Sequence, residues 1–222
     1  MRDPYGNRKS LEFGFRSKRF SHVARLIHAT LAEKGSCRIL DVGGTETYWK
    51  IGAELIAGHN VRIDLLNLQS VETSGPAFTS LVGDACDLSH IADNSYDLCH
   101  SNSVIEHVGD WADMKRAANE ISRIAPRYFV QVPYFWFPLE PHFRAPFFHW
   151  LPEQLRYRLL LRMNLGFHRR SANVDDAMRA IQSAKLLDRA QLASLFPEAE
   201  IAVERVALFI KSLMAIRDAG RD

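Results

Sequence analysis

Short apolar runs alternate with longer segments of helical periodicity along most of the chain. The five runs cover residues 38–42, 61–66, 78–82, 96–100 and 128–132. Strands that are apolar along their whole length are typical of parallel sheets whose two faces are both covered by helices. The pattern therefore predicts an α/β fold with a doubly wound, mostly parallel sheet and helices on both faces.

Two helices and a closing hairpin have clear sequence signals. Apolar residues recur at helical spacing over residues 21–33, and Gly35 suits the end of that helix. Asp110 can cap a second helix, which Pro126 must end. Near the C-terminus, AEIAVERV and SLMAIRD predict two strands a few residues apart. We expect them to add an antiparallel hairpin to the parallel sheet.

Basic residues gather in two parts of a chain whose net charge is only +2. We expect residues 1–35 to form a basic arm and the first helix, with the first 20 residues irregular, and residues 36–222 to form a single domain. The basic residues of the arm and of a second run are Arg2, Arg8, Lys9, Arg16, Lys18, Arg19 and Arg25, and Arg156, Arg158, Arg162, Arg169 and Arg170. These residues either lie on solvated faces of surface helices or contact a phosphate-bearing substrate or an anionic membrane.

An aromatic-rich insertion is expected at about residues 133–175. Its first part reads PYFWFPLEPHFRAPFFHWLPEQ, in which the prolines exclude a regular helix or a central strand. Three interpretations stay open. The aromatic side chains pack in a core or a dimer interface, form the wall or lid of a substrate pocket, or contact a membrane interface. The adjacent LRYRLLLRM, with interleaved arginines and leucines, favours the last.

The first predicted strand ends in the stretch LDVGGTETYW. Ligands of parallel sheets bind at the carboxyl ends of the strands, and Gly43 and Gly44 would let the backbone turn sharply there. The dinucleotide fingerprint requires further glycines at the positions that Thr45 and Tyr48 occupy. The loop therefore predicts a nucleotide-like ligand but argues against NAD.

Several stretches in fixed order resemble the motifs of class I S-adenosylmethionine-dependent methyltransferases. LDVGG resembles the first motif, LVGDACDL the third-strand motif, NSYDLCHSNSVIEHV the fourth-strand motif, and SLFPEAEIAVERV with SLMAIRD the closing antiparallel pair. The resemblance runs from about residue 36 to residue 217. It implies a Rossmann-like sheet, S-adenosyl-L-methionine as the cofactor and methyl transfer as the activity.

The resemblance also implies the residues that contact the cofactor. In the family, an acidic residue, here Asp84, bonds the adenine amino group, and the next residue, Ala85, offers its amide to the ring. The second strand normally ends in an acidic residue for the ribose. Asn67 stands there instead, which predicts weaker binding rather than its loss. The full expected set is Asp41, Gly43, Gly44, Thr45, Asn67, Leu68, Asp84, Ala85, Cys86, Ser101 and Asn102.

Candidates for proton transfer follow the fourth run. Ser103 and Glu106 have the spacing of a capping box, so Glu106 is interpreted as structural. His107 is the candidate base, because an ordinary histidine pKa of about 6.5 suits that role. His142 and His149 in the insertion are further candidates. No metal is expected, since the spacing of these residues fits no zinc pattern: Cys86, His90, Cys99, His100 and His107.

The three cysteines form no CxxC pair, and no apolar run approaches the roughly 18 residues that span a bilayer. We therefore expect a cytoplasmic protein, with peripheral membrane contact and a homodimer left open and no nucleic-acid partner. The expected acceptor is a small molecule or a glycan or lipid-linked compound. Two alternatives remain: a non-catalytic binding or regulatory protein on the same scaffold, and an NAD-dependent oxidoreductase.

Overall fold

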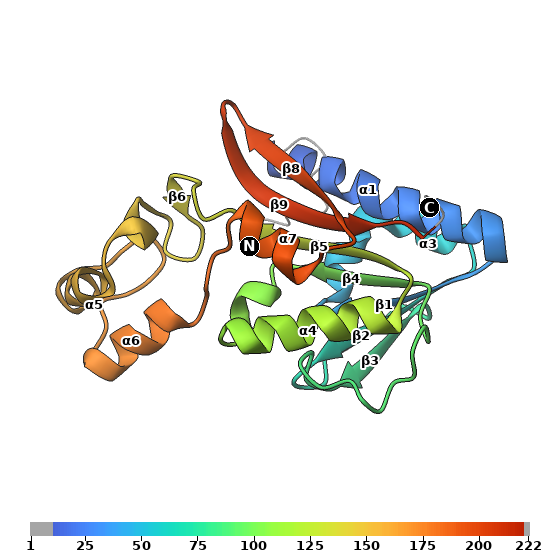
Figure 1. The fold of residues 1–222 in the computed structure, drawn as a ribbon, viewed down its shortest axis with the longest axis horizontal. Coiled ribbons are helices and arrows are strands. Elements are labelled where there is room, and N and C mark those ends of the chain that lie inside the picture. The colour runs from blue at the N-terminus through green and yellow to red at the C-terminus, as the bar shows by residue number, and fades with distance from the viewer. Residues whose placement is uncertain (1–10, 220–222) are drawn as a thin grey trace.

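A seven-stranded sheet forms the centre of the molecule (Figure 1). The computed structural model describes residues 11–219. The strand order is β3-β2-β1-β4-β5-β9-β8. The parallel strands are β1 (Cys37–Val42), β2 (Val61–Asn67), β3 (Phe78–Val82), β4 (Leu98–Asn102) and β5 (Arg127–Pro133). The antiparallel pair consists of β8 (Glu200–Val206) and β9 (Phe209–Arg217), with β9 beside β5. The predicted α/β fold with its closing hairpin is confirmed.

Helices cover both faces of the sheet (Figure 1). One face carries α1 (Leu11–Lys34), α2 (Glu46–Trp49), the 3-10 turn η1 (Lys50–Gly52) and α3 (Ala53–Ala57). The other carries α4 (Trp111–Ile124) and α7 (Arg189–Leu195). Neighbouring residues of a strand contribute to opposite cores: Ile39 packs with the α1 side and Leu40 with the α4 side. This alternation explains why the strands are apolar throughout.

Helix α1 begins at Leu11, so the expectation of an irregular segment up to residue 20 is wrong for residues 11–20. Phe20 is the reason: its ring is buried and meets the Trp49 ring edge-on at 6.1 Å, which fixes this part of the helix on the sheet. Gly35 ends the helix as predicted, with a φ of 71° and its amide bonded to the Leu31 carbonyl. The predicted basic residues Arg2, Arg8 and Lys9 lie outside the described residues.

Helix α4 begins and ends where the sequence predicts. The Asp110 carboxylate accepts hydrogen bonds from the amides of Ala112 and Asp113, and Asp113 bonds back to the Asp110 amide. Ala125 is already extended, as Pro126 requires of the residue before it. The cap and the proline therefore define this helix locally.

Strand β4 lies two residues further along the chain than predicted, at Leu98–Asn102. Tyr96 and Asp97 instead secure the approach to the strand: the Tyr96 amide bonds the Ile124 carbonyl, and the Asp97 carboxylate accepts from the Arg38 amide. The strand continues into polar residues because His100 has a buried partner, Asp41, on β1. A search for apolar runs alone misses such a strand end.

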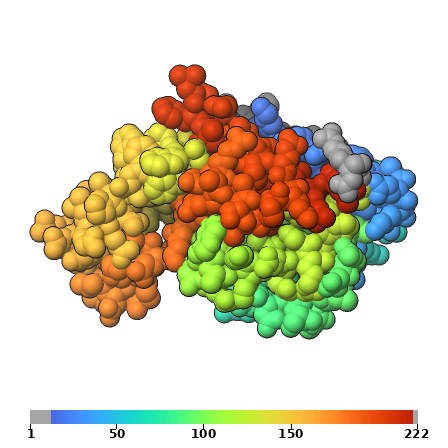
Figure 2. Space-filling model, viewed as in Figure 1, coloured from blue at the N-terminus to red at the C-terminus, as the bar shows by residue number. Residues whose placement is uncertain are grey.

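Residues 135–186 form a lobe beside the sheet, which Figure 2 shows in yellow and orange at one end of the molecule. Its elements are β6 (Leu139–Glu140), β7 (Ala145–Pro146), the 3-10 turn η3 (Phe148–Trp150), α5 (Glu153–Arg162) and α6 (Val174–Gln182). They enclose a small core of Phe143, Ala145, Phe148, Leu160, Ala177 and Ile181. Within residues 11–219, no helix combines the length and apolarity that crossing a bilayer requires.

Candidate functional site

The loop after β1 turns on two glycines that no other residue can replace without movement. Gly43 has a φ of 69°, and a Cβ built on it would lie 2.5 Å from Val104 Cγ2. A Cβ on Gly44 would lie 1.7 Å from Asp41 Oδ2. The Gly43 amide donates to the Leu66 carbonyl at 2.7 Å, which ties the turn to the end of β2. The backbone is therefore held close to the neighbouring strand ends, as a site for a nucleoside requires.

Asp41 holds this loop from beneath. Its carboxylate, 1% exposed, accepts hydrogen bonds from Trp49 Nε1 at 2.7 Å and from His100 Nδ1 at 2.6 Å. The His100 ring stacks on Phe129 with centroids 5.6 Å apart and lies 4.6 Å from the Tyr48 ring. Because both carboxylate oxygens are engaged in the core, Asp41 connects β1, β4 and α2. Its place in the structure is that of a positioning residue under the loop.

A cavity of about 620 Å³ opens above the loop, beyond the carboxyl ends of β1, β2 and β3. Five of the expected cofactor residues line it: Gly43, Asn67, Leu68, Asp84 and Ala85. Asn67 Nδ2 donates to the Gly44 carbonyl at 3.0 Å, so its amide connects β2 to the glycine turn. The candidate base His107 lines the same cavity. Residues far apart in the chain thus meet where the resemblance predicts a nucleoside.

The other six expected cofactor residues do not line the cavity: Asp41, Gly44, Thr45, Cys86, Ser101 and Asn102. The Cys86 thiol donates to the Asp113 carbonyl, and Asn102 Oδ1 accepts from Arg19. Ser101 is buried in β4 with no partner for its hydroxyl among the described residues. Thr45 precedes α2, and its side chain makes no capping bond.

Sequence reasoning missed other lining residues. Among them are three that follow Leu68 and two that flank the 3-10 turn after β4: Gln69, Ser70, Val71, Val104 and Val108. The sequence did offer a signal for Gln69, Ser70 and Val71, because the chain that leaves the end of β2 must pass along the edge of the cavity. Val104 and Val108 had no such signal. They reach the cavity because a 3-10 turn, η2 (Ile105–His107), carries the chain over the glycine loop after β4.

The predicted capping box at Ser103 and Glu106 is wrong. Ser103 takes a left-handed φ of 58°, and its hydroxyl donates to Gln131 Oε1 on β5 at 2.9 Å. Glu106 is 1% exposed, and neither carboxylate oxygen has a hydrogen-bond partner among the described residues. Burial raises the pKa of Glu106 to about 7. The local spacing suggested a helix start, whereas the tertiary structure places an unpaired carboxyl group there.

His107 faces a second histidine from the lobe. Its Nδ1 lies 2.7 Å from the Ser183 carbonyl oxygen, and its Nε2 lies 3.2 Å from His142 Nε2. His142 Nδ1 lies 2.7 Å from a carboxylate oxygen of Glu140. Partial desolvation lowers the pKa of His107, whose side chain is still exposed, while the hydrogen bond to Glu140 raises the pKa of His142. The lobe thus contributes directly to this edge of the site; His149, the other candidate there, bonds the Phe135 carbonyl through Nε2 instead.

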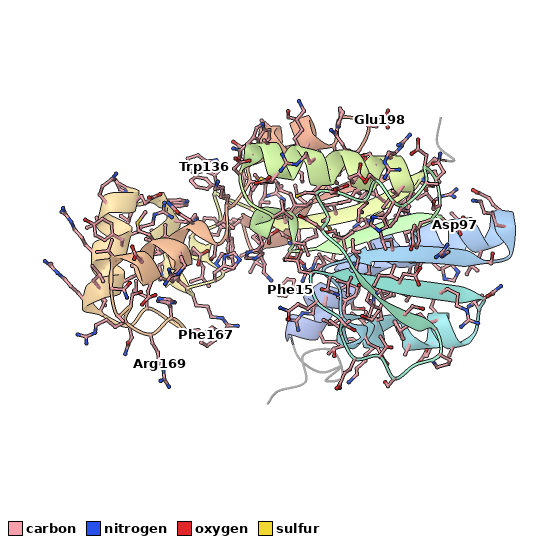
Figure 3. All side chains as sticks on the ribbon, turned by 90° about the horizontal axis from the view of Figure 1, so that it is seen from below. Phe15, Asp97, Trp136, Phe167, Arg169 and Glu198 are labelled. Carbon is pink, nitrogen blue, oxygen red and sulfur yellow. The ribbon has the colours of Figure 1, made fainter. Side chains whose placement is uncertain are left out.

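A groove of about 380 Å³ lies on the other side of the Ser103–Val104 turn. Its walls include four cationic side chains and one carboxylate: Arg16, Arg19, Arg144, Lys211 and Glu204. Arg19 pairs with Glu204 at 3.1 Å, and the Arg144 guanidinium stacks over Phe167 at 4.3 Å. Lys211 lies 5.1 Å from the ring of Phe15, which Figure 3 shows on the side of the sheet body that faces the lobe. The groove joins the sheet, α1 and the lobe.

Comparisons with known proteins agree with this geometry. Residues 40–127 match the family model described as a methyltransferase domain. A S-adenosylmethionine-dependent methyltransferase structure from Methanosarcina mazei superposes with a TM-score of 0.53 at 16% identity, covering 86% of this chain and 94% of that one. No curated protein matches the chain.

Two further solved structures have the same fold. Magnesium protoporphyrin IX methyltransferase of Synechocystis PCC 6803, with bound S-adenosylmethionine, gives a TM-score of 0.51 at 13% identity over 96% of this chain and 88% of that one. The 1,6-didemethyltoxoflavin-N1-methyltransferase of Burkholderia thailandensis gives 0.50 at 13% identity over 90% and 79%. The family model matches residues 40–127, and the solved structures show that the chain has the fold of class I S-adenosylmethionine-dependent methyltransferases.

Proposed function

We propose that the protein transfers the methyl group of S-adenosylmethionine to an anionic acceptor, either a small molecule or a glycan or lipid-linked compound. The observation that carries the proposal is the groove beside the Ser103–Val104 turn, whose four cationic side chains outnumber its single carboxylate. A phosphate or carboxylate group on the acceptor would be attracted there and oriented by the arginines, which bind such groups in a bidentate manner.

The residues of the 620 Å³ cavity fit the cofactor. The two glycines let the turn lie directly against Val104 and Asp41, which a Cβ at either position would meet, and Gly43 lines the cavity itself. Asn67 and Asp84 provide polar groups at its rim for the ribose and the adenine. S-Adenosylmethionine supplies a methyl group that is already activated. The chain's contribution is to hold the acceptor in line and to exclude water, which lowers the barrier by several kcal/mol.

His107 is the proposed proton acceptor for a hydroxyl or amine on the acceptor. Its Nδ1 faces a carbonyl oxygen and therefore carries the hydrogen, which leaves the lone pair on Nε2. That atom lies beside His142 Nε2, so a proton taken up by His107 could pass to the lobe histidine and be stabilised by Glu140. This assignment makes the lobe part of the active site.

Calorimetry with S-adenosylmethionine, S-adenosylhomocysteine and NAD tests the cofactor. Binding of the first two, with a stabilisation of about 2.7 kcal/mol at 100 times the dissociation constant, is expected. Binding of NAD alone would support the oxidoreductase. Binding without methyl transfer to any acceptor fraction would support the non-catalytic alternative.

The acceptor is tested with labelled cofactor and the small-molecule and lipid fractions of a cell extract. We expect Arg144→Ala to raise KM about tenfold with little change in kcat, because a charge-assisted hydrogen bond contributes about 1.5 kcal/mol or more. Arg169→Ala is the matched control, since Arg169 points into solvent on the lobe (Figure 3). Equal kinetics for the two variants would contradict an anionic acceptor in the groove.

Contact with a membrane surface stays a prediction for the lobe. Trp136, Phe147 and Trp150 are 54%, 51% and 39% exposed, and Trp150 lies within 6.0 Å of both other rings. Exposed aromatic side chains next to basic residues are typical of proteins that bind at the lipid headgroups. Such contact would bring a lipid-linked acceptor to the groove.

A further inference from the structure

Three potential metal ligands meet where the lobe touches η2. One atom each from Glu106, His107 and His142 lies within 4.8 Å of the other two. Glu106 and His107 follow β4, whereas His142 belongs to the loop between β6 and β7. Glu106 and His142 are 36 positions apart in the sequence, so no short spacing pattern predicts that the three residues meet.

The hydrogen bonds of the two imidazoles fix which nitrogens carry hydrogen. A carbonyl oxygen faces His107 Nδ1 and a carboxylate oxygen faces His142 Nδ1, and both are acceptors only. Each Nδ1 is therefore the donor, and in the neutral rings each Nε2 carries a lone pair. Yet the two Nε2 atoms lie only 3.2 Å apart. Two lone pairs at this separation repel unless a positive species lies between them.

The separation of the two Nε2 atoms suits a metal ion. With zinc–nitrogen bonds of about 2.0–2.1 Å and a tetrahedral angle, two ligand nitrogens lie about 3.3 Å apart. Metal-binding histidines also commonly donate their other nitrogen to a carbonyl or carboxylate, as both rings do here. Glu140 is itself held, because its second oxygen accepts from the Phe143 amide.

Glu106 distinguishes a metal ion from a shared proton. A proton between the rings would relieve their repulsion but would leave the buried carboxyl group without a partner. A divalent cation would satisfy the carboxylate and both lone pairs together. Two histidines and one glutamate are a ligand set that zinc and other first-row metals use in sites with a free coordination position.

We propose that Glu106, His107 and His142 bind a divalent transition-metal ion, with Zn²⁺ as the probe. The ion would join the lobe to the sheet, since two ligands belong to the sheet body and one to the lobe. It would also lie between the cofactor cavity, which His107 lines, and a cavity of about 230 Å³ in the lobe that His142 and Glu140 line. When the metal is bound, His107 is a ligand, and the proton-acceptor role proposed above passes to another group.

The test is metal binding by the full chain after dialysis against EDTA, with no S-adenosylmethionine present. We expect calorimetry to give one Zn²⁺ per chain, and Co²⁺ to give the visible absorption of a tetrahedral site. Glu106→Gln, His107→Gln and His142→Gln should each weaken Zn²⁺ binding at least tenfold. Glu106→Gln preserves shape, so it keeps the test informative should a histidine variant not fold.

His59→Gln is the matched control. His59 and His28 form another edge-on histidine pair, with ring centroids 5.9 Å apart, on the exposed surface and outside the metal-ligand cluster. We expect this variant to bind Zn²⁺ like the parent protein. Absence of stoichiometric Zn²⁺ binding by the parent, or equal binding by all four variants, would overturn the proposal. Failure of S-adenosylmethionine binding in the same preparation would instead overturn the proposed function and leave the metal site standing.

Discussion

The glycine loop and the lobe form the two sides of the candidate site, and they are held in different ways. The loop rests on the buried group of Asp41, His100 and Trp49 and on strands that pair along their length. The lobe has a separate small core, and the hydrogen bonds that join it to the sheet body include Lys185 amide to Glu106 carbonyl and Phe135 amide to Leu187 carbonyl. The proposed cofactor side is therefore built into the fold, whereas the proposed acceptor side depends on how an added segment docks.

Two substitutions share the largest expected loss of stability, and the first of them is on the loop side. Asp41→Ala leaves the buried donors Trp49 Nε1 and His100 Nδ1 without an acceptor, which should cost about 3 kcal/mol of unfolding free energy. Urea denaturation measures the loss, and cofactor binding should weaken with it. Asp93→Ala, which removes a 70% exposed partner of Arg123, should cost less than about 1 kcal/mol. Similar losses for the two variants would mean that Asp41 does not support the loop.

The next prediction concerns the independence of the lobe. Phe148→Ala removes a ring that is 2% exposed in the lobe core, at a cost of about 3 kcal/mol. Because that core is separate, we expect faster amide hydrogen exchange in residues 135–186 and less than a twofold change in S-adenosylmethionine affinity. Phe147→Ala, at the exposed neighbouring position, should leave exchange in the lobe nearly unchanged. A large loss of cofactor affinity in Phe148→Ala would show that the two sides are coupled.

A smaller effect is expected from Asn67→Ala at the cavity rim. The substitution removes the bond to the Gly44 carbonyl and the polar group proposed for the ribose, so cofactor affinity should fall about tenfold, or by about 1.4 kcal/mol. Calorimetry measures the change. Asn60→Ala, at an exposed position before β2, provides the comparison. Unchanged cofactor affinity in Asn67→Ala would mean that the ribose does not bind at this strand end.

The smallest expected effect is on binding to lipid vesicles. Trp150→Ala should lower the affinity for anionic phospholipid vesicles about fivefold, because burying part of such a ring in the lipid contributes about 1 kcal/mol. Co-sedimentation with the vesicles measures the change. Val82→Ala removes an exposed apolar side chain on β3, at the edge of the sheet far from the lobe (Figure 1), and should bind like the parent. If the parent protein itself does not sediment with vesicles, the exposed aromatic side chains do not bind a membrane surface.

Much of the sheet could be predicted because its signals are local. Apolar runs place β1, β2, β3 and β5 within one or two residues, and Asp110 with Pro126 defines α4. The polar end of β4 and the first turns of α1 were missed. Both depend on contacts across the fold, namely His100 with Asp41 and Phe20 with Trp49. The periodicity of apolar residues does not indicate contacts between residues that are far apart in the sequence.

The sequence by itself determined the fold class and the edge of the sheet where a ligand is expected, because glycine turns and strand ends are short-range features. Only the tertiary structure decided what the polar residues near that edge do. Ser103 bonds Gln131 rather than capping a helix, Glu106 becomes a buried carboxyl group without a hydrogen-bond partner in residues 11–219, and His107 meets His142. Each of these outcomes depends on a contact between distant segments, and it is the docking of the lobe that brings His142 to the site.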